Sequence, residues 1–477
     1  MAINDIFDIG RQGIEANRRA LTTTSQNVAN ANTPGYSRQR AVFQSDARSA
    51  TGGVMLGGGV KIEKVMRIHN DFVQGQIMEE AKNHGGLRAR SEGLMRIEGQ
   101  VNERGRDLAE RVNNFFNAFR ELSTNPEQAT LKLNAANAAE DVARSFRSVI
   151  QSLETLKNEA DLNLMGQVGG VNQLTREVAT LNEQIALNQA VRGEPNELLD
   201  RREEILRQLS GKVGFQTYYD DRGMATIVSG TAVLVQGTQA NELEAVRSAA
   251  RGTKTEGSVE IMMVDRMGNR NIPVRVEDGE MGGMMHIRDN VINPILSQVD
   301  AAAFEFSQQV NAAHTVGVAD GETSVGAIFD PIENASGAAG RIQINSLIKD
   351  NPDAIVGGLS QGPGDNRVAL SIAAIGEKTV MPEFFGGQKG DTPRLTLTES
   401  LNSTMGFLGA ETQRERQAFE SSDRIMSQLN NYRESVSGVS LEEEAINMIQ
   451  YQHAFNAAAK ATKVGDELLQ TILNIKQ

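Results

Sequence analysis

One serine in the sequence stands in the pattern that many hydrolases use for their nucleophile. Gly358-Leu359-Ser360-Gln361-Gly362 matches G-x-S-x-G, in which a sharp strand-to-helix turn exposes the hydroxyl for attack on an acyl carbon. That turn needs a helix directly after the serine, and Pro363-Gly364 follow here instead. We therefore interpret this stretch as a chance match in a loop. A secreted serine hydrolase on a helical scaffold remains an alternative function that depends on Ser360 alone.

Metal and phosphate chemistry find even weaker support in the sequence. Asp320, Glu322 and Asp330 resemble a calcium loop only loosely, because the alternating ligands and the central glycine are missing. The glycines of residues 52–59 lack the Gly-Lys-Ser/Thr ending of a phosphate-binding loop and favour a turning loop. The histidines do not pair at metal-ligand spacing; they are His69, His84, His286, His314 and His453. The sequence predicts no catalytic residue, no metal and no cofactor.

Composition excludes several further classes of protein. The 477 residues carry a net charge of −13, which argues against a broad nucleic-acid-binding face. Cysteine is absent, so disulfides and thiolate sites are excluded. No stretch approaches the roughly 18 apolar residues that span a bilayer. Asp5 and Asp8 stand where a cleaved signal peptide would carry positive charge and an apolar run.

Residues 3–31 predict one long amphipathic helix. Its apolar positions alternate four and three apart, which is a heptad seam with polar interruptions at Asn17 and Thr24. The apolar positions that we expect to form an assembly interface are Ile3, Phe7, Ile14, Leu21 and Val28.

The helix ends in a run of asparagines followed by Thr33-Pro34-Gly35-Tyr36. Pro34 lacks the N–H that a helix needs, and it pushes Thr33 out of the helical region. Pro34-Gly35 also suits the two central positions of a type II turn. We expect a helix stop and a domain border here, formed by Asn30, Asn32, Pro34, Gly35 and Tyr36.

The rest of the chain alternates between helical and strand-like composition. Residues 70–210 are helical, with breaks at Pro126 and Pro195, and residues 401–476 are helical again. Short alternating segments between 213 and 285 predict a small β-rich insertion. The predicted fold is α+β but mainly α, elongated and multi-domain. The terminal helices pair as a coiled coil, beside a long helical bundle with the inserted β domain.

Three domains follow from this division. A terminal coiled-coil domain comprises residues 1–35 with 445–477, and an elongated helical-bundle domain with minor β elements comprises 36–212 with 286–444. The β-rich outer domain comprises 213–285.

The last helix carries apolar residues along two stripes, so it must touch more than one neighbour. One neighbour could be the N-terminal helix, and we expect the other to belong to a different molecule. Periodicity alone does not distinguish this from a coiled coil that merely closes the molecule. The C-terminal residues that we assign to the assembly interface are Phe455, Val464, Leu468, Ile472 and Ile475.

Both ends of the chain resemble the bacterial flagellar axial proteins, which comprise rod, hook and hook-associated proteins. The N-terminal match is S-Q-N-V-A-N-A-N-T-P-G-Y at 25–36, and its continuation Tyr36-Ser37-Arg38-Gln39 resembles the hook-associated members most closely. The C-terminal match is G-V-S-L-E-E-E-A at 438–445 with M-I-Q-Y-Q at 448–452. Patches at 282–289 and 364–366 also fit.

The resemblance implies a structural, non-enzymatic component of the flagellum that forms the hook–filament junction. It implies type III export without a cleaved signal, from the cytoplasm to an extracellular position. The implied partners are further copies of the chain, hook protein, hook-associated protein 3 and a cytoplasmic export chaperone at the C-terminal helix. No nucleic acid or membrane partner is implied. Another axial component, either hook protein or hook-associated protein 3, remains the alternative within the family.

Overall fold

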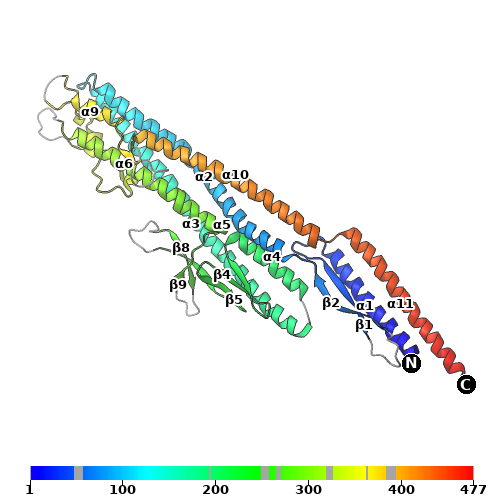
Figure 1. The fold of residues 1–477 in the computed structure, drawn as a ribbon. Coiled ribbons are helices and arrows are strands. Elements are labelled where there is room, and N and C mark those ends of the chain that lie inside the picture. The colour runs from blue at the N-terminus through cyan, green and yellow to red at the C-terminus, as the bar shows by residue number, and fades with distance from the viewer. Residues whose placement is uncertain are drawn as a thin grey trace.

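The computed structural model describes residues 2–47, 57–192, 195–248, 257–264, 270–317, 326–360, 364–382 and 394–475. Its shape is elongated, because a few very long helices run along one axis (Figure 1). The N- and C-termini lie together at one end, and a helical bundle fills the other. Among the described residues, no helix combines the length and apolarity needed to cross a membrane.

Five helices build the bundle around one apolar core. The helices are α2 (Asp71–Leu122), α3 (Ala129–Arg192), α6 (Asn293–His314), α9 (Arg367–Ile375) and α10 (Leu397–Ser437). α3 alone has 64 residues, a length of about 96 Å at 1.5 Å per residue. The breaks before and after α3 contain Pro126 and Pro195, as the sequence predicts.

Phenylalanines fill the core at the far end of the bundle. Phe306 is fully buried, and its ring lies 5.0 Å from that of Phe115 and 5.3 Å from that of Phe329. Short elements close this end: α7 (Ala338–Arg341), α8 (Ser346–Asp350), η2 (Pro352–Ala354), β10 (Met381–Pro382) and β11 (Arg394–Leu395).

Two small antiparallel sheets pack against α3 and α4 (Asn196–Lys212). One has the order β3-β4-β5-β6 and the other β7-β8-β9. Their strands are β3 (Gln216–Tyr219), β4 (Ala225–Ser229), β5 (Ala232–Gln236), β6 (Gln239–Ala240), β7 (Glu242–Arg247), β8 (Val259–Val264) and β9 (Arg270–Pro273). Their buried side chains join those of α3 and α4 in a second core. The strands predicted between residues 213 and 285 are therefore present.

Helix resumes before residue 285, the end that the sequence predicts for the β-rich insertion. α5 (Gly279–His286) leads into a π-helical turn, η1 (Ile287–Ile292), and then into α6. Arg288 of η1 is fully buried, and its Nη1 donates to Asp161 Oδ1 at 2.8 Å and to the Val259 carbonyl at 2.6 Å. This pair ties β8 to α3 and to the π-helical turn.

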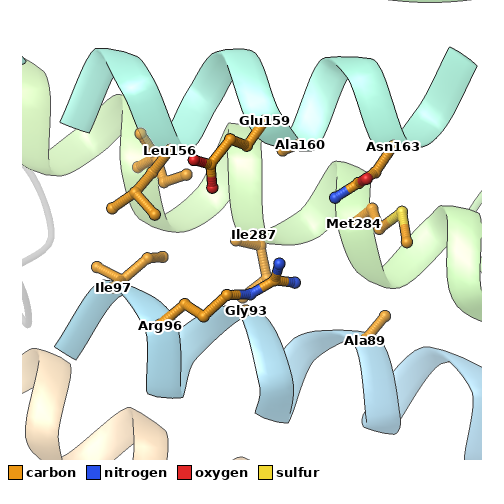
Figure 2. A pocket seen from close by; sticks show the side chains of 11 residues that line it. Ala89, Gly93, Arg96, Ile97, Leu156, Glu159, Ala160, Asn163, Met284 and Ile287 are labelled. Carbon is orange, nitrogen blue, oxygen red and sulfur yellow. The ribbon is translucent and has the colours of Figure 1, made fainter. Parts of the chain in front are cut away.

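A crevice lies between α2, α3 and the α5–η1 segment (Figure 2). Arg96 and Glu159 point into it, above an apolar floor that includes Ile287. Its volume of about 30 Å³ leaves room for about two water molecules. Pockets for organic ligands are roughly ten times larger, so this crevice is not a substrate site.

The terminal arm consists of α1 (Ala2–Ala29), β1 (Gln39–Ala47), β2 (Gly57–Arg67) and α11 (Leu441–Ile475). The two helices pack side by side, and β1 and β2 form an antiparallel hairpin against α1 (Figure 1). The mainly α, elongated fold with paired terminal helices is confirmed. β2 is an addition, because its first glycines favour a turning loop when the sequence is considered alone.

Candidate assembly interface

Small residues form the seam between α1 and α11. A side chain on Gly10 would collide with Thr462, and a Cβ on Gly13 would lie 3.2 Å from the Cβ of Ala458. Gly465 of α11 meets Ile6 in the same close manner. The two helices therefore approach closely but bury little apolar volume against each other.

The fully buried positions of α1 are small or polar, whereas its large apolar residues are half-buried or exposed. Phe7, Ile14 and Leu21 are only half-buried, and Val28 is 38% exposed. Ile3 lies in α1, but its side chain is outside the described part of the chain. The buried positions are small or polar: Ala16, Asn17, Ala20, Thr23, Thr24 and Asn27.

An apolar stripe on α11 faces solvent. Val464 is 53% exposed and Leu468 45% exposed, whereas Phe455 is half-buried. The side chains of Ile472 and Ile475 are outside the described part of the chain. We call this exposed row the outer stripe; it comprises Ile446, Ile449, Ala457, Ala461, Val464 and Leu468.

The predicted turn after α1 has the expected geometry. The Tyr36 N–H donates to the Thr33 carbonyl at 3.2 Å across Pro34-Gly35, and Gly35 has a φ of +82°. These values fit a type II turn. The Asn30 side chain donates to the Gln26 carbonyl at 3.0 Å and satisfies the end of the helix, while Asn32 is exposed.

Asn27, two residues before the end of α1, uses its whole amide group. Its Oδ1 accepts from the Gln39 N–H and from the Tyr36 hydroxyl, both at 2.9 Å. Its Nδ2 donates to the Gln39 carbonyl at 2.8 Å and to Glu444 Oε2 at 3.0 Å. This one side chain joins α1, the connector after the turn and the start of α11.

Arg38 fastens the same connector to the C-terminal helices. Its guanidinium donates to Glu444 Oε1 at 2.7 Å and to Glu443 Oε2 at 2.6 Å, and its backbone N–H donates to the Ser437 carbonyl. The Glu444 side chain is 2% exposed, so this carboxylate depends on these partners.

A second ion cluster fixes the connector to α4. Arg67 donates to Asp200 Oδ1 at 2.7 Å and to Glu203 Oε2 at 3.1 Å, and Asp200 also accepts from the Ser37 N–H. Burial raises the pKa of Glu203. Burial, with Asp200 and other carboxylates nearby, also raises the pKa of Tyr36 to about 12. We call these contacts of Asn27, Arg38, Arg67, Asp200 and Glu444 the joint.

The joint is not predicted by the sequence patterns. Asn27 and Arg38 lie inside the quoted terminal motif, and Glu444 lies in the acidic start of the last helix, but their pairing spans more than 400 positions. The sequence did offer one sign of the joint, because charged or amide-bearing side chains stand in a motif at the border of each terminal helix.

The serine of the hydrolase alternative lies in a bend. Ser360 Oγ donates to Asp365 at 2.7 Å and accepts from Arg367 at 3.1 Å, and the next helix begins only at Arg367. The hydroxyl is thus part of a loop network around Asp365 that, among the described residues, includes no histidine. Asp320 and Glu322 lie outside the described residues, and the described part of the chain holds no group of three acidic or histidine side chains arranged around a metal.

Three family models match separate parts of the chain. "Flagellar hook-associated protein FlgK helical domain" matches residues 94–329. "Flagellar basal body rod FlgEFG protein C-terminal" matches 433–475, and "Flagella basal body rod protein" matches 7–36. The last two coincide with the two helices of the terminal arm.

Relatives and a solved structure agree with these models. The chain is 28% identical to flagellar hook-associated protein 1 of Bacillus subtilis, over 98% of this chain and 97% of that one. It is 23% identical to the Salmonella typhimurium protein of the same name, over 99% and 100%. The fold matches the flagellar hook junction protein FlgK of Burkholderia pseudomallei with a TM-score of 0.64 and 14% identity, over 76% of this chain and 100% of that one. The chain is therefore similar over nearly its whole length to flagellar hook-associated protein 1, and is, like these homologues, a structural component of the bacterial flagellum and not an enzyme.

Proposed function

We propose that this chain forms the junction between the hook and the filament, and that it joins the flagellar axis through its terminal arm. The observation that carries the proposal is the outer stripe of α11, where Val464 and Leu468 stand exposed although the seam with α1 is complete. Apolar rows of this kind on a soluble chain mark interaction surfaces. The structural relative from Burkholderia pseudomallei is a hook junction protein, which supports the same position.

The partners follow from that position. Copies of the chain pack beside one another through the terminal arms, with hook protein on one side and hook-associated protein 3 on the other. Contacts between unlike faces generate a ring or a helical array instead of a closed pair. The domain division predicted from sequence fits this arrangement. The terminal domain forms the inner tube, and the bundle lies outside it.

Export precedes assembly in this proposal. The chain leaves the cytoplasm through the flagellar type III apparatus and becomes extracellular, and a cytoplasmic chaperone covers the C-terminal helix beforehand. The outer stripe gives that chaperone an apolar surface. The absence of cysteine suits a chain that is threaded through a channel without forming disulfides on the way.

Substitution of aspartate on the stripe tests the proposal. Leu468→Asp should leave a folded protein that no longer attaches filaments, because an unpaired charge in an apolar contact costs several kcal/mol. Asn456→Asp, on the polar side of α11, is the matched control and should assemble normally. The measurements are circular dichroism of the purified protein and electron microscopy of filaments in a strain that lacks its own copy. Normal filaments with Leu468→Asp would contradict the proposal.

A further inference from the structure

The long helix α10 changes its kind of packing along its length. In its first part, the large buried side chains are apolar and belong to the core of the bundle: Leu397, Leu401, Met405 and Leu408. From residue 409 to 437, all of which the structure describes, the buried residues are polar: Glu411, Thr412, Glu415, Ser422 and Ser437. The large apolar residues of this second part, such as Phe419, are half-buried at most. We call residues 409–437 the strap.

Polar contacts join the strap to α2. Ser422 Oγ donates to Glu80, and His84 Nε2 lies 3.3 Å from Asp423 Oδ1. The His84 ring also lies 5.1 Å from the ring of Phe419. Asp423 is 63% exposed, so water competes for this pair. Contacts of this kind contribute little to stability, because the polar groups find equivalent partners in water when the contact opens.

One buried group makes the closed position of the strap costly. Glu415 is 6% exposed, and its Oε2 is buried without a hydrogen-bond donor. Arg90 Nε of α2 lies 3.6 Å from this oxygen, which is too far for a hydrogen bond. A buried carboxylate oxygen without a donor loses the hydrogen bonds that it would make with water. Separation of the strap from α2 exposes Glu415 to solvent and removes that cost.

The neighbouring part of α2 has other partners that keep it in place. A Cβ on Gly85 would lie 2.1 Å from the carbonyl oxygen of Gly211 in α4, so these backbones are in direct contact. A Cβ on Gly86 would lie 3.3 Å from the carbonyl oxygen of Gly279 at the start of α5. These close backbone contacts do not involve the strap, and they remain when it separates from α2.

The strap forms one of the two chain connections between the bundle and the terminal arm. α10 runs along α2 from the bundle to the joint, and α11 follows it directly (Figure 1). The other connection is the short segment between β2 and α2. At the joint, the Ser437 carbonyl of the strap accepts from the Arg38 N–H at 2.9 Å. A movement of the strap is therefore passed to α11 through the chain itself.

We infer that the strap is a conformational device of the single chain. It separates from α2 as one unit while residues 397–408 stay in the core, and its release lets the arm turn relative to the bundle. Segments with few buried apolar contacts are the ones that open locally, at a lower free energy than the whole protein. The inference goes beyond the proposed function and does not depend on what the outer stripe meets.

Thiol labelling of the purified full-length chain tests the opening, because the natural chain contains no cysteine that could interfere. Ser422→Cys on the strap and Thr404→Cys in the first part of α10 both replace a buried hydroxyl group. Ser422→Cys should react at least about tenfold faster than Thr404→Cys, because only the strap opens locally. Thr412→Cys and Ser400→Cys are second variants for the same two parts, and circular dichroism checks that each variant is folded. Equal rates in the two parts would overturn the inference.

Two further substitutions separate opening of the strap from unfolding of the bundle. Phe306→Ala should speed the labelling of Thr404→Cys and leave that of Ser422→Cys unchanged, because the strap opens without the core. Glu415→Met removes the buried carboxylate and should slow the labelling of Ser422→Cys about tenfold. Glu420→Met, at an exposed position of the same helix, is the matched control and should leave the rate unchanged. Equal acceleration of both cysteines by Phe306→Ala, or no effect of Glu415→Met, would contradict the inference.

A distance measurement tests the effect on the arm. Spin labels on Leu347→Cys in the bundle and Asn456→Cys on α11 report the orientation of the arm, since both positions are exposed. Glu415→Met should narrow the distribution of distances between the labels, because a strap held more firmly on α2 holds the arm. An unchanged distribution would show that the strap does not govern the arm. The proposed function would survive that outcome, because it depends on filament attachment by Leu468→Asp and not on movement within one copy.

Discussion

The far end of the bundle and the terminal arm use their apolar residues in opposite ways. In the bundle, large aromatic side chains are inside: Phe115, Phe146, Phe306 and Phe329 are fully buried and their rings pack together. In the arm, the buried face of α1 consists of alanine, threonine and asparagine, and larger residues such as Val28 and Leu468 are exposed.

This difference has an energetic meaning. Full burial of one phenylalanine contributes about 1.5–3 kcal/mol, whereas alanine and glycine contacts contribute much less. The bundle can therefore stabilise itself. The arm depends on hydrogen bonds at the joint and leaves the apolar residues of the outer stripe exposed. A body that is stable by itself and an arm with an exposed apolar stripe fit the proposed assembly through the arm.

The largest effect that we predict comes from emptying the bundle core. Phe306→Ala should lower the free energy of unfolding by about 3–5 kcal/mol, because the cavity cannot be refilled by the rings around it. The measurement is urea unfolding followed by circular dichroism. Leu347→Ala, at a residue that is 64% exposed, is the control and should change stability little. If both variants lost the same free energy of unfolding, the buried phenylalanines would not be what stabilises the bundle.

The bundle should also lose stability in acid through His314. Burial lowers the pKa of this imidazole to about 4, and its two nitrogens contact the Gly326 carbonyl at 2.8 Å and the Val356 N–H at 3.1 Å. The folded state therefore binds the proton less tightly than the unfolded state, whose pKa is about 6.5. The stability from the neutral ring is complete above that pH and falls by about 3 kcal/mol as the pH drops toward 4.

A titration of stability against pH checks this contribution. His314→Gln should start from a lower stability but lose less between pH 6.5 and 4, because the glutamine side chain does not titrate there. If the slope is the same in both proteins, other groups govern acid unfolding of the bundle.

The helices could be predicted from sequence because their boundaries depend on local chemistry. Pro126 and Pro195 cannot continue a helix, and a helix ends a few residues before each of them. The turn at Pro34-Gly35 was predictable for the same reason, since proline fixes one dihedral angle and glycine permits a positive one.

The packing of the arm was not predictable, because it depends on close approach and not on apolar periodicity. The heptad pattern places Phe7, Gly10 and Ile14 in one row, and Phe7 and Gly10 do meet α11, but Gly13, which lies outside the pattern, also approaches Ala458. β2 was hidden because it begins with Gly57, and glycine is depleted in strands. That the outer stripe packs against another molecule in the assembled flagellum stays a prediction.

The joint offers a smaller effect that should be confined to the arm. Arg38→Met leaves the buried Glu444 carboxylate with Asn27 as its remaining side-chain donor, which should cost about 2 kcal/mol. Because the bundle core is untouched, hydrogen exchange should speed up in α1 and α11 while α6 keeps its protection. Arg40→Met, at an exposed arginine two residues later, is the control. Uniform acceleration in all three helices would show that arm and bundle unfold as one unit.

The smallest predicted effect concerns the Tyr36 hydroxyl, which donates a hydrogen bond to Asn27 of the joint and can also lose its proton at high pH. Tyr36→Phe removes the hydroxyl that donates to Asn27 and should destabilise the arm by about 1 kcal/mol at neutral pH. Because the pKa of Tyr36 is raised to about 12 when folded, the folded arm holds this proton more tightly than the unfolded chain, whose pKa is about 10. The contribution is therefore complete below pH 10 and is lost as the pH rises toward 12. Hydrogen exchange is too fast at that pH, so the thiol reactivity of an Ala20→Cys variant, at a buried position of α1, reports arm opening instead. Tyr36→Phe should remove the alkaline part of that opening, and an unchanged alkaline slope would assign it to another group in the arm.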